Sequence, residues 1–227
     1  MKTFEIKNKS GKVIAKVKCA EGRNNLCCAD MRGLNLTGAN LAGANLTNAN
    51  LSYADLSYAN LADANLAGAN LSYAYFTNAN LAEANLAVAN LSYAYLAEAN
   101  LAGANLSYAV LAGANLTNAN LTNENLTDAN LAGADLSYAN LAEANLAGAN
   151  LIIAGVDERG YMFYATGNGE SIQIRAGCRM FSSIKDARAH WQARHDGNLP
   201  LKAQCLAFVD TIESLAKVKG WIKETTS

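Results

Sequence analysis

The sequence predicts an all-β solenoid, a chain wound into stacked coils of four short sides. Leucine recurs every fifth residue from Leu36 to Leu151, and Phe76 is the single exception among 24 positions. A period of five fits neither a helix, whose turn takes 3.6 residues, nor a flat strand, whose side chains alternate. The chain must therefore change direction once per five-residue unit, so that every leucine points to one axis.

The number of sides follows from the tyrosines. Tyr53, Tyr73 and Tyr93 are twenty residues apart, as are Tyr75 and Tyr95. Four units per coil would place these rings above one another on successive coils, where aromatic neighbours stabilise each other. Three units per coil would scatter them. The spacing therefore favours a square coil, with stacked backbones about 4.8 Å apart.

The other positions of the unit are nearly as regular as the leucine. Two before the leucine stands alanine, with Leu34 and Glu124 as exceptions, and one before it stands Asn or Asp, with Tyr75, Tyr95 and Val110 as exceptions. One after it is Ala, Ser or Thr, except for Ile152 after Leu151, and only the position two after it varies freely. We expect Leu and Ala inside the coil, and Asn or Asp with a small neighbour at the corners.

These units resemble the pentapeptide-repeat family and its A(D/N)LXX consensus. Units 39–43 (Ala-Asn-Leu-Ala-Gly) and 54–58 (Ala-Asp-Leu-Ser-Tyr) are examples, and the resemblance covers residues 24–156. It implies a right-handed quadrilateral β-helix with four units per coil, in which the central Leu and the Ala two before it point inward. Leu26, Met31 and Val156 continue the register and are expected at its ends.

The flanks are expected to cap this solenoid, because a stack of coils exposes apolar layers at its ends. A β-hairpin of strands 3–7 and 12–18 is predicted for residues 1–23, and the repeat spans 24–156. The last segment, 157–227, is predicted to form a hairpin of strands 161–166 and 171–176, followed by two helices. The helices cover about 183–194, with a capping box of Ser183 and Asp186, and 201–219. Their expected apolar positions are Ile184, Ala187 and Trp191, then Leu201, Cys205, Phe208, Ile212 and Leu215.

The second helix is expected to cap the coil, and pairing with its copy in a homodimer is the alternative. The units recur almost verbatim, which favours a consensus-designed array between natural caps over a recently duplicated natural array such as a phage gene. The segment 157–161, with Gly177-Cys178-Arg179 and His190-Trp191, resembles the tail of phage-associated pentapeptide-repeat proteins.

The array offers almost no catalytic chemistry. Between Leu34 and Leu151 there are eight acidic residues and no Lys, Arg, His or Cys, whereas the flanks carry +5 and +2. Without a base to activate a hydroxyl we expect no enzyme, and no catalytic, cofactor or metal site. Cys178, His190, His195 and Cys205 could make a zinc site, and Cys178 with His190 a nucleophile pair, but we expect structural roles. The basic residues of the N-terminal hairpin, expected to be solvated rather than to bind nucleic acid, are Lys2, Lys7, Lys9, Lys12, Lys16 and Lys18.

The sequence therefore predicts a non-enzymatic structural scaffold with no cofactor. The alternative, implied by family members that resemble duplex DNA, is a DNA mimic that binds DNA gyrase. No segment predicts a membrane span or signal peptide, and five cysteines without a C-x-x-C motif predict free thiols in a reducing cytoplasm.

Overall fold

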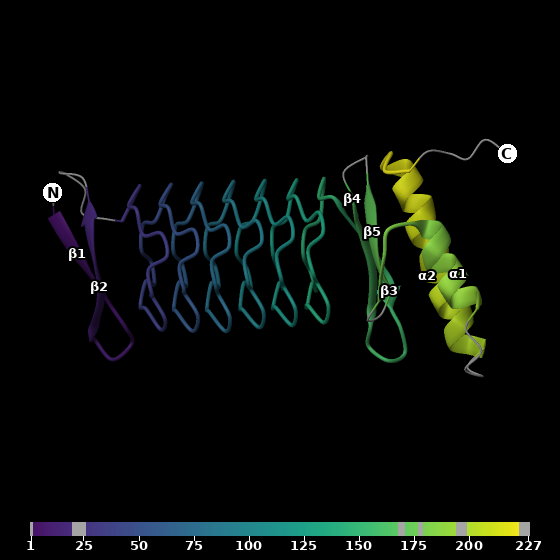
Figure 1. Cartoon of the computed structure of the whole chain (residues 1–227), viewed down its shortest axis with the longest axis horizontal. Coiled ribbons are helices and arrows are strands. Elements are labelled where there is room, and N and C mark those ends of the chain that lie inside the picture. The colour runs from purple at the N-terminus through teal and green to yellow at the C-terminus, as the bar shows by residue number, and fades with distance from the viewer. Residues whose placement is uncertain (1, 20–25, 168–170, 177–178, 194–198, 223–227) are drawn as a thin grey trace. The chain divides into compact units, whose positions relative to one another are not determined.

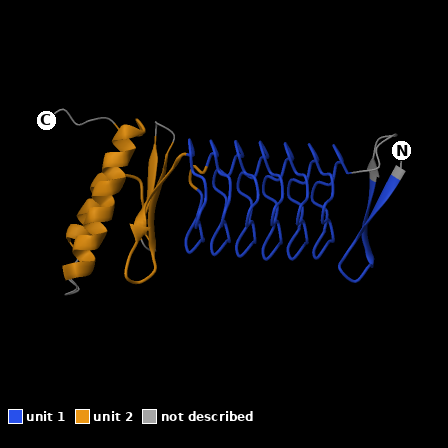
Figure 2. Ribbon diagram, turned by 180° about the vertical axis from the view of Figure 1, so that it is seen from behind, with its two compact units in different colours: residues 1–130, 134–149 blue, residues 131–133, 150–227 orange. Residues whose placement is uncertain are grey.

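The computed structural model describes residues 2–19, 26–167, 171–176, 179–193 and 199–222. The chain divides into two compact units, coloured separately in Figure 2. The first comprises Met1–Asn130 and Ala134–Ala149, and the second Leu131–Gly133 and Asn150–Ser227. Within the described ranges, no helix has the length and apolar character needed to cross a bilayer.

The first unit contains the coils, which Figure 1 shows stacked along one axis. Each outward Asn, Asp, Tyr or Val that precedes a leucine forms a parallel β-bridge with the residue twenty positions later, from Asp30↔Asn50 to Asn125↔Asn145. Twenty residues per coil means four units per coil. The square coil predicted from the tyrosine spacing is therefore confirmed.

The interior is filled as the sequence predicts. From Leu36 to Leu136 the central leucine or Phe76 is buried in every unit, and the preceding alanines from Ala49 to Ala119 are buried with them. Leu26 and Met31 are also buried, which confirms that the register extends to them. Val156 is 52% exposed, so its predicted inward position is wrong.

Unit 54–58, in which Asp55 precedes the leucine, hydrogen-bonds all five of its backbone N–H groups. Along the flat side of this unit, one amide donates to the preceding coil and one to the following coil. A third donates to the following coil at the corner, and a fourth closes the turn before the unit. The fifth, of Ser57, has no backbone acceptor and donates to the Asp55 side chain at 2.9 Å. The other four bonds are Ala54 to Leu51 O (3.0 Å), Asp55 to Leu34 O (2.9 Å), Leu56 to Tyr75 O (2.7 Å) and Tyr58 to Thr77 O (2.9 Å).

This pattern corrects the predicted role of Asn and Asp. They lie on the flat sides, where the β-bridges are, and the corner is formed by the two residues after each leucine. The second of these has a positive φ in every unit, as in a type II turn. Asn or Asp is needed because its oxygen accepts the one N–H that the coil leaves over, as an Asx-turn does. The pattern of the sequence was read correctly, but the corner was placed on the wrong residues.

The N-terminal hairpin belongs to the same unit. Strands β1 (Lys2–Lys7) and β2 (Val13–Cys19) pair antiparallel, and Ile6 and Val17 are buried. The Asn8 side chain accepts from the backbone N–H groups of Ser10 and Lys12 and so shapes the turn. The Lys7 carbonyl accepts from the Asn40 N–H at 2.7 Å, which joins the hairpin to the coil.

The second unit is a four-stranded antiparallel sheet with two helices. Its strands, in the order β3-β4-β5-β6, are Leu151–Val156, Met162–Gly167, Ile172–Ala176 and Arg179–Phe181. The hairpin β4–β5 was predicted, although its 168–170 turn lies outside the described residues. Strands β3 and β6 were not predicted. The repeat was expected to reach residue 156, but β3 begins at Leu151 although that leucine keeps the five-residue register.

The helices agree with the sequence to within two residues. They are α1 (Ile184–Gln192) and α2 (Leu199–Val218), and they pack on each other and on the sheet. The Ser183 hydroxyl accepts from the Asp186 N–H at 3.1 Å, which confirms the predicted cap of α1. Leu215 is 41% exposed, contrary to expectation. The residues of α2 that are buried are Leu201, Cys205, Val209, Ile212 and Ala216.

Val88 is the residue least suited to its corner. It has a φ of 55°, in the left-handed region that costs an L-residue about 1–2 kcal/mol, and it is β-branched and exposed. We expect Val88→Gly to raise the free energy of unfolding by roughly 1 kcal/mol, because part of the relief is offset by glycine's greater freedom in the unfolded chain. The measurement is the midpoint of denaturant unfolding.

Val88→Ala is the matched control, because alanine keeps the left-handed strain and loses only the branch. Its midpoint should lie between those of the parent and of Val88→Gly. A Val88→Gly midpoint at or below the parent's would show that the corner does not carry this strain.

Candidate functional site

The most distinctive surface of the coil is one side that carries tyrosines. Seven of them lie on a flat side or on the two corners that border it, and we call this the tyrosine face. All seven are exposed by more than a third, an arrangement rare for large aromatic side chains. Its members are Tyr53, Tyr73 and Tyr93 on one corner, Tyr75 and Tyr95 on the side, and Tyr58 and Tyr138 on the other corner.

The rings of the tyrosine face form two stacks along the coil axis. Tyr53 and Tyr73 have centroids 5.0 Å apart and planes within 1° of parallel, and Tyr73 and Tyr93 are 5.1 Å apart. Tyr75 and Tyr95 are 4.7 Å apart. These separations follow the coil spacing of about 4.8 Å, so the backbone sets the stacking. The tyrosine ladder predicted from the sequence is confirmed.

Glycine ends the longer stack. Gly113 lies on the same corner one coil beyond Tyr93, and a Cβ built on Gly113 would lie 2.6 Å from two ring carbons of Tyr93. The same relation places the carboxylate of Glu83 against Gly103. Corner side chains therefore lean toward the following coil, and a glycine there makes room for them.

The neighbouring side of the coil carries a ladder of asparagines. The Asn80 side-chain amide donates to Asn60 at 3.2 Å, Asn100 to Asn80 at 3.2 Å and Asn120 to Asn100 at 3.0 Å. Each Oδ1 also accepts a backbone N–H two residues on, as Asn100 does from Ala102. These amides are thus engaged within the coil and offer little to a ligand.

Glu124 is not a surface charge, although its sequence position among the acidic residues suggested one. It occupies an alanine position inside the coil and is 1% exposed, and neither carboxyl oxygen has a hydrogen-bond partner. Burial raises its pKa to about 9, and the nearby N–H groups of Leu106 and Ala104 offset this only in part. Those amides already donate to the carbonyls of Asn125 and Leu101. Glu124 is therefore neutral at pH 7, and seven acidic residues of the array remain charged.

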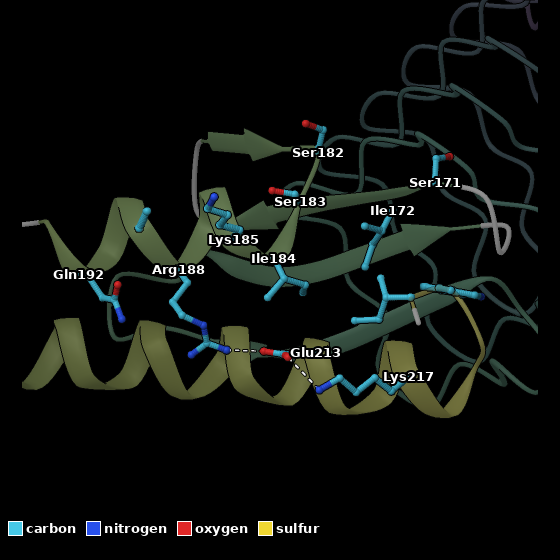
Figure 3. Close-up of a pocket in the computed structure, with 13 residues that line it drawn as sticks. Ser171, Ile172, Ser182, Ser183, Ile184, Lys185, Arg188, Gln192, Glu213 and Lys217 are labelled. Atoms are coloured by element: carbon cyan, nitrogen blue, oxygen red, sulfur yellow. Dashed lines mark hydrogen bonds and ion pairs between the residues drawn. The ribbon is translucent and has the colours of Figure 1, made fainter. Parts of the chain in front are cut away.

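The second unit contains a pocket of about 780 Å³, shown in Figure 3. In this pocket the Glu213 carboxylate forms ion pairs with Arg188 and with Lys217, whose ammonium lies 2.9 Å away. The hydrogen bond from Lys217, with that from Arg188, lowers the pKa of Glu213. The residues that line it are Ser171, Ile172, Ser182, Ser183, Ile184, Lys185, Arg188, Ala189, Gln192, Glu213, Lys217, Trp221 and Ile222.

No His or Cys is among the described residues that line this pocket, and its one carboxylate, that of Glu213, is paired with Arg188 and Lys217. The Ser183 hydroxyl is engaged with Asp186 as the cap of α1. Arg188 also pairs with Asp210, so its charge is already balanced. Sequence reasoning did not find this pocket, because its residues come from strands, helix ends and loops far apart in the chain.

The zinc and nucleophile hypotheses find no support in the described residues. His190 lies against the rings of Phe181 and Trp191, and Cys205 is buried in the core of the second unit. Cys178 and His195 lie outside the residues that the structure describes. Within the described ranges, no group of three or more His, Cys, Asp or Glu side chains is arranged to hold a metal.

The segment 157–161 has a structural role at the turn between β3 and β4. Asp157 has a fully buried side chain that accepts from the N–H groups of Arg159 and Tyr161 and pairs with the Arg159 guanidinium at 2.6 Å. That guanidinium lies over the Tyr161 ring at 5.1 Å and the Trp191 ring at 5.8 Å. These contacts fix the turn against α1 and use the polar groups that a site would need.

The described lysines of the N-terminal hairpin, Lys7, Lys9, Lys12 and Lys16, are exposed, and Lys16 pairs with Glu5 at 3.0 Å. The side chains of Lys2 and Lys18 lie outside the described residues. That these lysines are solvated and do not bind nucleic acid stays a prediction from the sequence.

The twenty-residue coil, its leucine interior and its left-handed corners define a four-sided β-solenoid. A family model described as pentapeptide repeats matches the chain in eight copies, over residues 29–66, 59–87, 84–123 and 125–152. These matches cover more than half of the chain, so the chain belongs to the pentapeptide-repeat family.

Several solved structures are similar to part of the chain. HetL, involved in heterocyst differentiation regulation in the cyanobacterium Nostoc sp. strain PCC 7120, is 38% identical over 55% of this chain and 62% of its own, with a TM-score of 0.24. A protein of the Arabidopsis thaliana thylakoid lumen is 30% identical over 53% and 66%, with a TM-score of 0.27. Full-length QnrB1, a plasmid-mediated fluoroquinolone resistance protein, is 20% identical over 58% and 75%, with a TM-score of 0.30.

The chain thus spans less than two thirds of HetL and of the Arabidopsis protein. A search of the curated proteins gives no match.

Glu124 makes a prediction for the dependence of stability on pH. Its pKa is about 9 in the fold and 4.5 in the ordinary state, so the unfolded chain loses this proton first as pH rises. Its contribution to stability is therefore complete below about pH 4.5 and is lost as pH rises toward 9, by about 1.4 kcal/mol per pH unit. At pH 7 the loss is roughly 3 kcal/mol, and Glu124→Ala should recover it.

Glu124→Gln is the matched control, because it keeps the shape and removes the titration. The difference in free energy of unfolding between Glu124→Gln and the parent should grow steadily from pH 5 to pH 8. A difference that stays constant over this range would mean that Glu124 reaches solvent in the folded chain.

Proposed function

We propose that the protein is a non-enzymatic structural scaffold, a rigid pentapeptide-repeat rod whose outward side chains form an interaction surface. The observation that supports this most directly is how the repeat uses its polar groups. Most backbone N–H groups of the array bond within it, and the array from Leu34 to Leu151 contains no His, Cys, Lys or Arg. What remains available is a set of outward side chains on a regular frame.

Hydroxyl groups that donate to neutral amides support this proposal, whereas those of Thr37 and Ser137 donate to the carboxylates of Asp55 and Asp135. Ser72 donates to Asn70 Oδ1 at 2.8 Å, and Ser92 donates to Asn90 Oδ1 at 2.7 Å. Thr117 and Thr127 make the same contact with Asn115 and Asn125. A hydroxyl bonded to a neutral amide has no base to remove its proton, so these groups are not activated nucleophiles.

The tyrosine face is the surface that we propose for interaction. Tyrosine combines a large apolar ring with a polar hydroxyl and loses little conformational freedom on binding, which is why it is enriched in interfaces. The near-verbatim units, such as Leu-Ala-Gly-Ala-Asn, support consensus design of the frame. The flanks would then be its caps, the N-terminal one through the bond from Asn40 to Lys7. Helix α2 buries Leu201, Cys205, Val209, Ile212 and Ala216 in its own unit, which speaks against a homodimer through this helix.

A DNA mimic that binds a topoisomerase is the second candidate, because the array has acidic residues and no bases. About six coils at about 4.8 Å span roughly 30 Å, over which duplex DNA carries about 18 negative charges. With Glu124 neutral, the array carries seven. Three of these, Asp63, Glu83 and Glu143, share one corner, and the rest are dispersed. The charge density therefore favours the scaffold.

A DNA gyrase supercoiling assay tests the two proposals against each other. We expect micromolar protein to leave supercoiling unchanged at both low and moderate salt, because seven dispersed charges cannot replace those of a duplex. Inhibition at low salt that fades as salt rises would contradict the scaffold proposal and support the mimic.

The variant Asp63→Asn/Glu83→Gln/Glu143→Gln removes the charged corner and makes the assay specific. For a mimic it should relieve inhibition, whereas Glu98→Gln, on another corner, should change it little. For a scaffold, neither variant should differ from the parent.

A further inference from the structure

The first turn of the coil carries two adjacent cysteines that the repeat does not need. Cys27 and Cys28 occupy the two corner positions after Leu26, where later units have Ala, Ser or Thr and then a variable residue. The Ala29 N–H closes the turn on the Leu26 carbonyl at 3.1 Å, and the Cys28 N–H donates to the Thr47 carbonyl at 2.9 Å. Cys28 has the left-handed φ of 58° found at every corner. The backbone under both thiols is thus fixed by the coil.

This turn brings the two sulfur atoms together. The Sγ atoms of Cys27 and Cys28 lie 3.4 Å apart, with Cys28 exposed and Cys27 half-buried, and neither forms a disulfide. A disulfide would require a separation of about 2.05 Å. Two thiolates that share one soft centre at about 2.3 Å each lie roughly 3.4–3.8 Å apart. The observed separation, at which one thiol donates a hydrogen bond to the other, lies at the lower end of this range.

The number of ligands narrows the chemistry. Zinc at a structural site takes four ligands, but in the described part of the chain no group of three His, Cys, Asp or Glu side chains could hold an ion. Two thiols suffice for a soft centre that brings its own third substituent. We propose that Cys27 and Cys28 form a dithiol site for monosubstituted trivalent arsenicals, R–As(OH)₂, whose arsenic has three bonds.

The reaction balances without an oxidant. Each thiol sulfur forms one bond to arsenic, and each bond from arsenic to hydroxyl breaks. Each hydroxyl leaves as water with the proton of one thiol, so that one arsenical and two thiols give R–As(S–Cys)₂ and two waters. Arsenic stays trivalent. The product joins the side chains of the two corner residues in the turn that Leu26 and Ala29 close. Because the folded turn already holds the two sulfurs together, it should bind the arsenical more tightly than the unfolded chain does, and the adduct should stabilise the first coil.

The test is titration of the full-length protein with phenylarsine oxide, followed by intact mass and by the number of thiols that remain reactive. We expect one arsenical per chain, the loss of two reactive thiols and a higher unfolding temperature. A small dithiol should remove the arsenical, whereas a monothiol at equal thiol concentration should not. Binding that a monothiol reverses, or an adduct that consumes one thiol, would overturn the proposal.

The decisive variants are Cys27→Ser and Cys28→Gly, because Ser and Gly occupy these corner positions in later units and so fit the fold. Each should abolish the monothiol-resistant adduct while the unfolding transition is kept. The control Cys19→Ser/Cys178→Ser/Cys205→Ser keeps the pair alone and should bind like the parent. Retention of the adduct in either decisive variant, or its loss in the control, would show that other cysteines hold the arsenic.

Discussion

One constraint underlies the whole array: a chain that turns every five residues must still satisfy every backbone N–H. Four of the five amides in a unit find carbonyl oxygens in the turn or in adjacent coils, and the fifth finds none. Because a buried amide without an acceptor is costly, the side chain two residues earlier supplies the oxygen. This explains why Asn or Asp stands there in nearly every unit, and why Ser57 and Asp55 form the contact that they do.

The same turn fixes what the outward positions can be. The corner requires a positive φ, which Gly, Asn and Asp adopt most readily, yet Tyr, Glu and Val adopt it here as well. They can do so because every neighbouring coil repeats the turn and holds it with hydrogen bonds. A side chain at the corner then leans over the next coil, so that Tyr73 stacks on Tyr93 and Tyr93 covers Gly113. The order of residues along a corner therefore determines the surface.

Features that follow from the five-residue period could be predicted from the sequence. Features that depend on single departures from the period could not. Leucine spacing gave the interior, and the tyrosine spacing gave the number of sides. Leu151 keeps the register and yet opens β3, because pairing with β4 replaces pairing with another coil. Glu124 was counted as a charge although the sequence already places it at an alanine position, and that position lies inside the coil. The buried face of α2 includes Ala216 instead of the predicted Leu215, because the helix packs against both β3 and α1.

Chemistry in such a chain is available only where the consensus is broken. A consensus unit commits its amides, its Asn and its hydroxyl to the coil, so it has little left with which to bind or react. Tyr75 and Tyr95 replace the Asx side chain and expose rings, and Cys27 with Cys28 place two thiols on a turn that others fill with Ala or Ser. The frame holds these departures at separations set by its own geometry, 4.7 Å between rings and 3.4 Å between sulfurs. Function in this fold should therefore be sought at the exceptions, since regular units supply only the spacing between them.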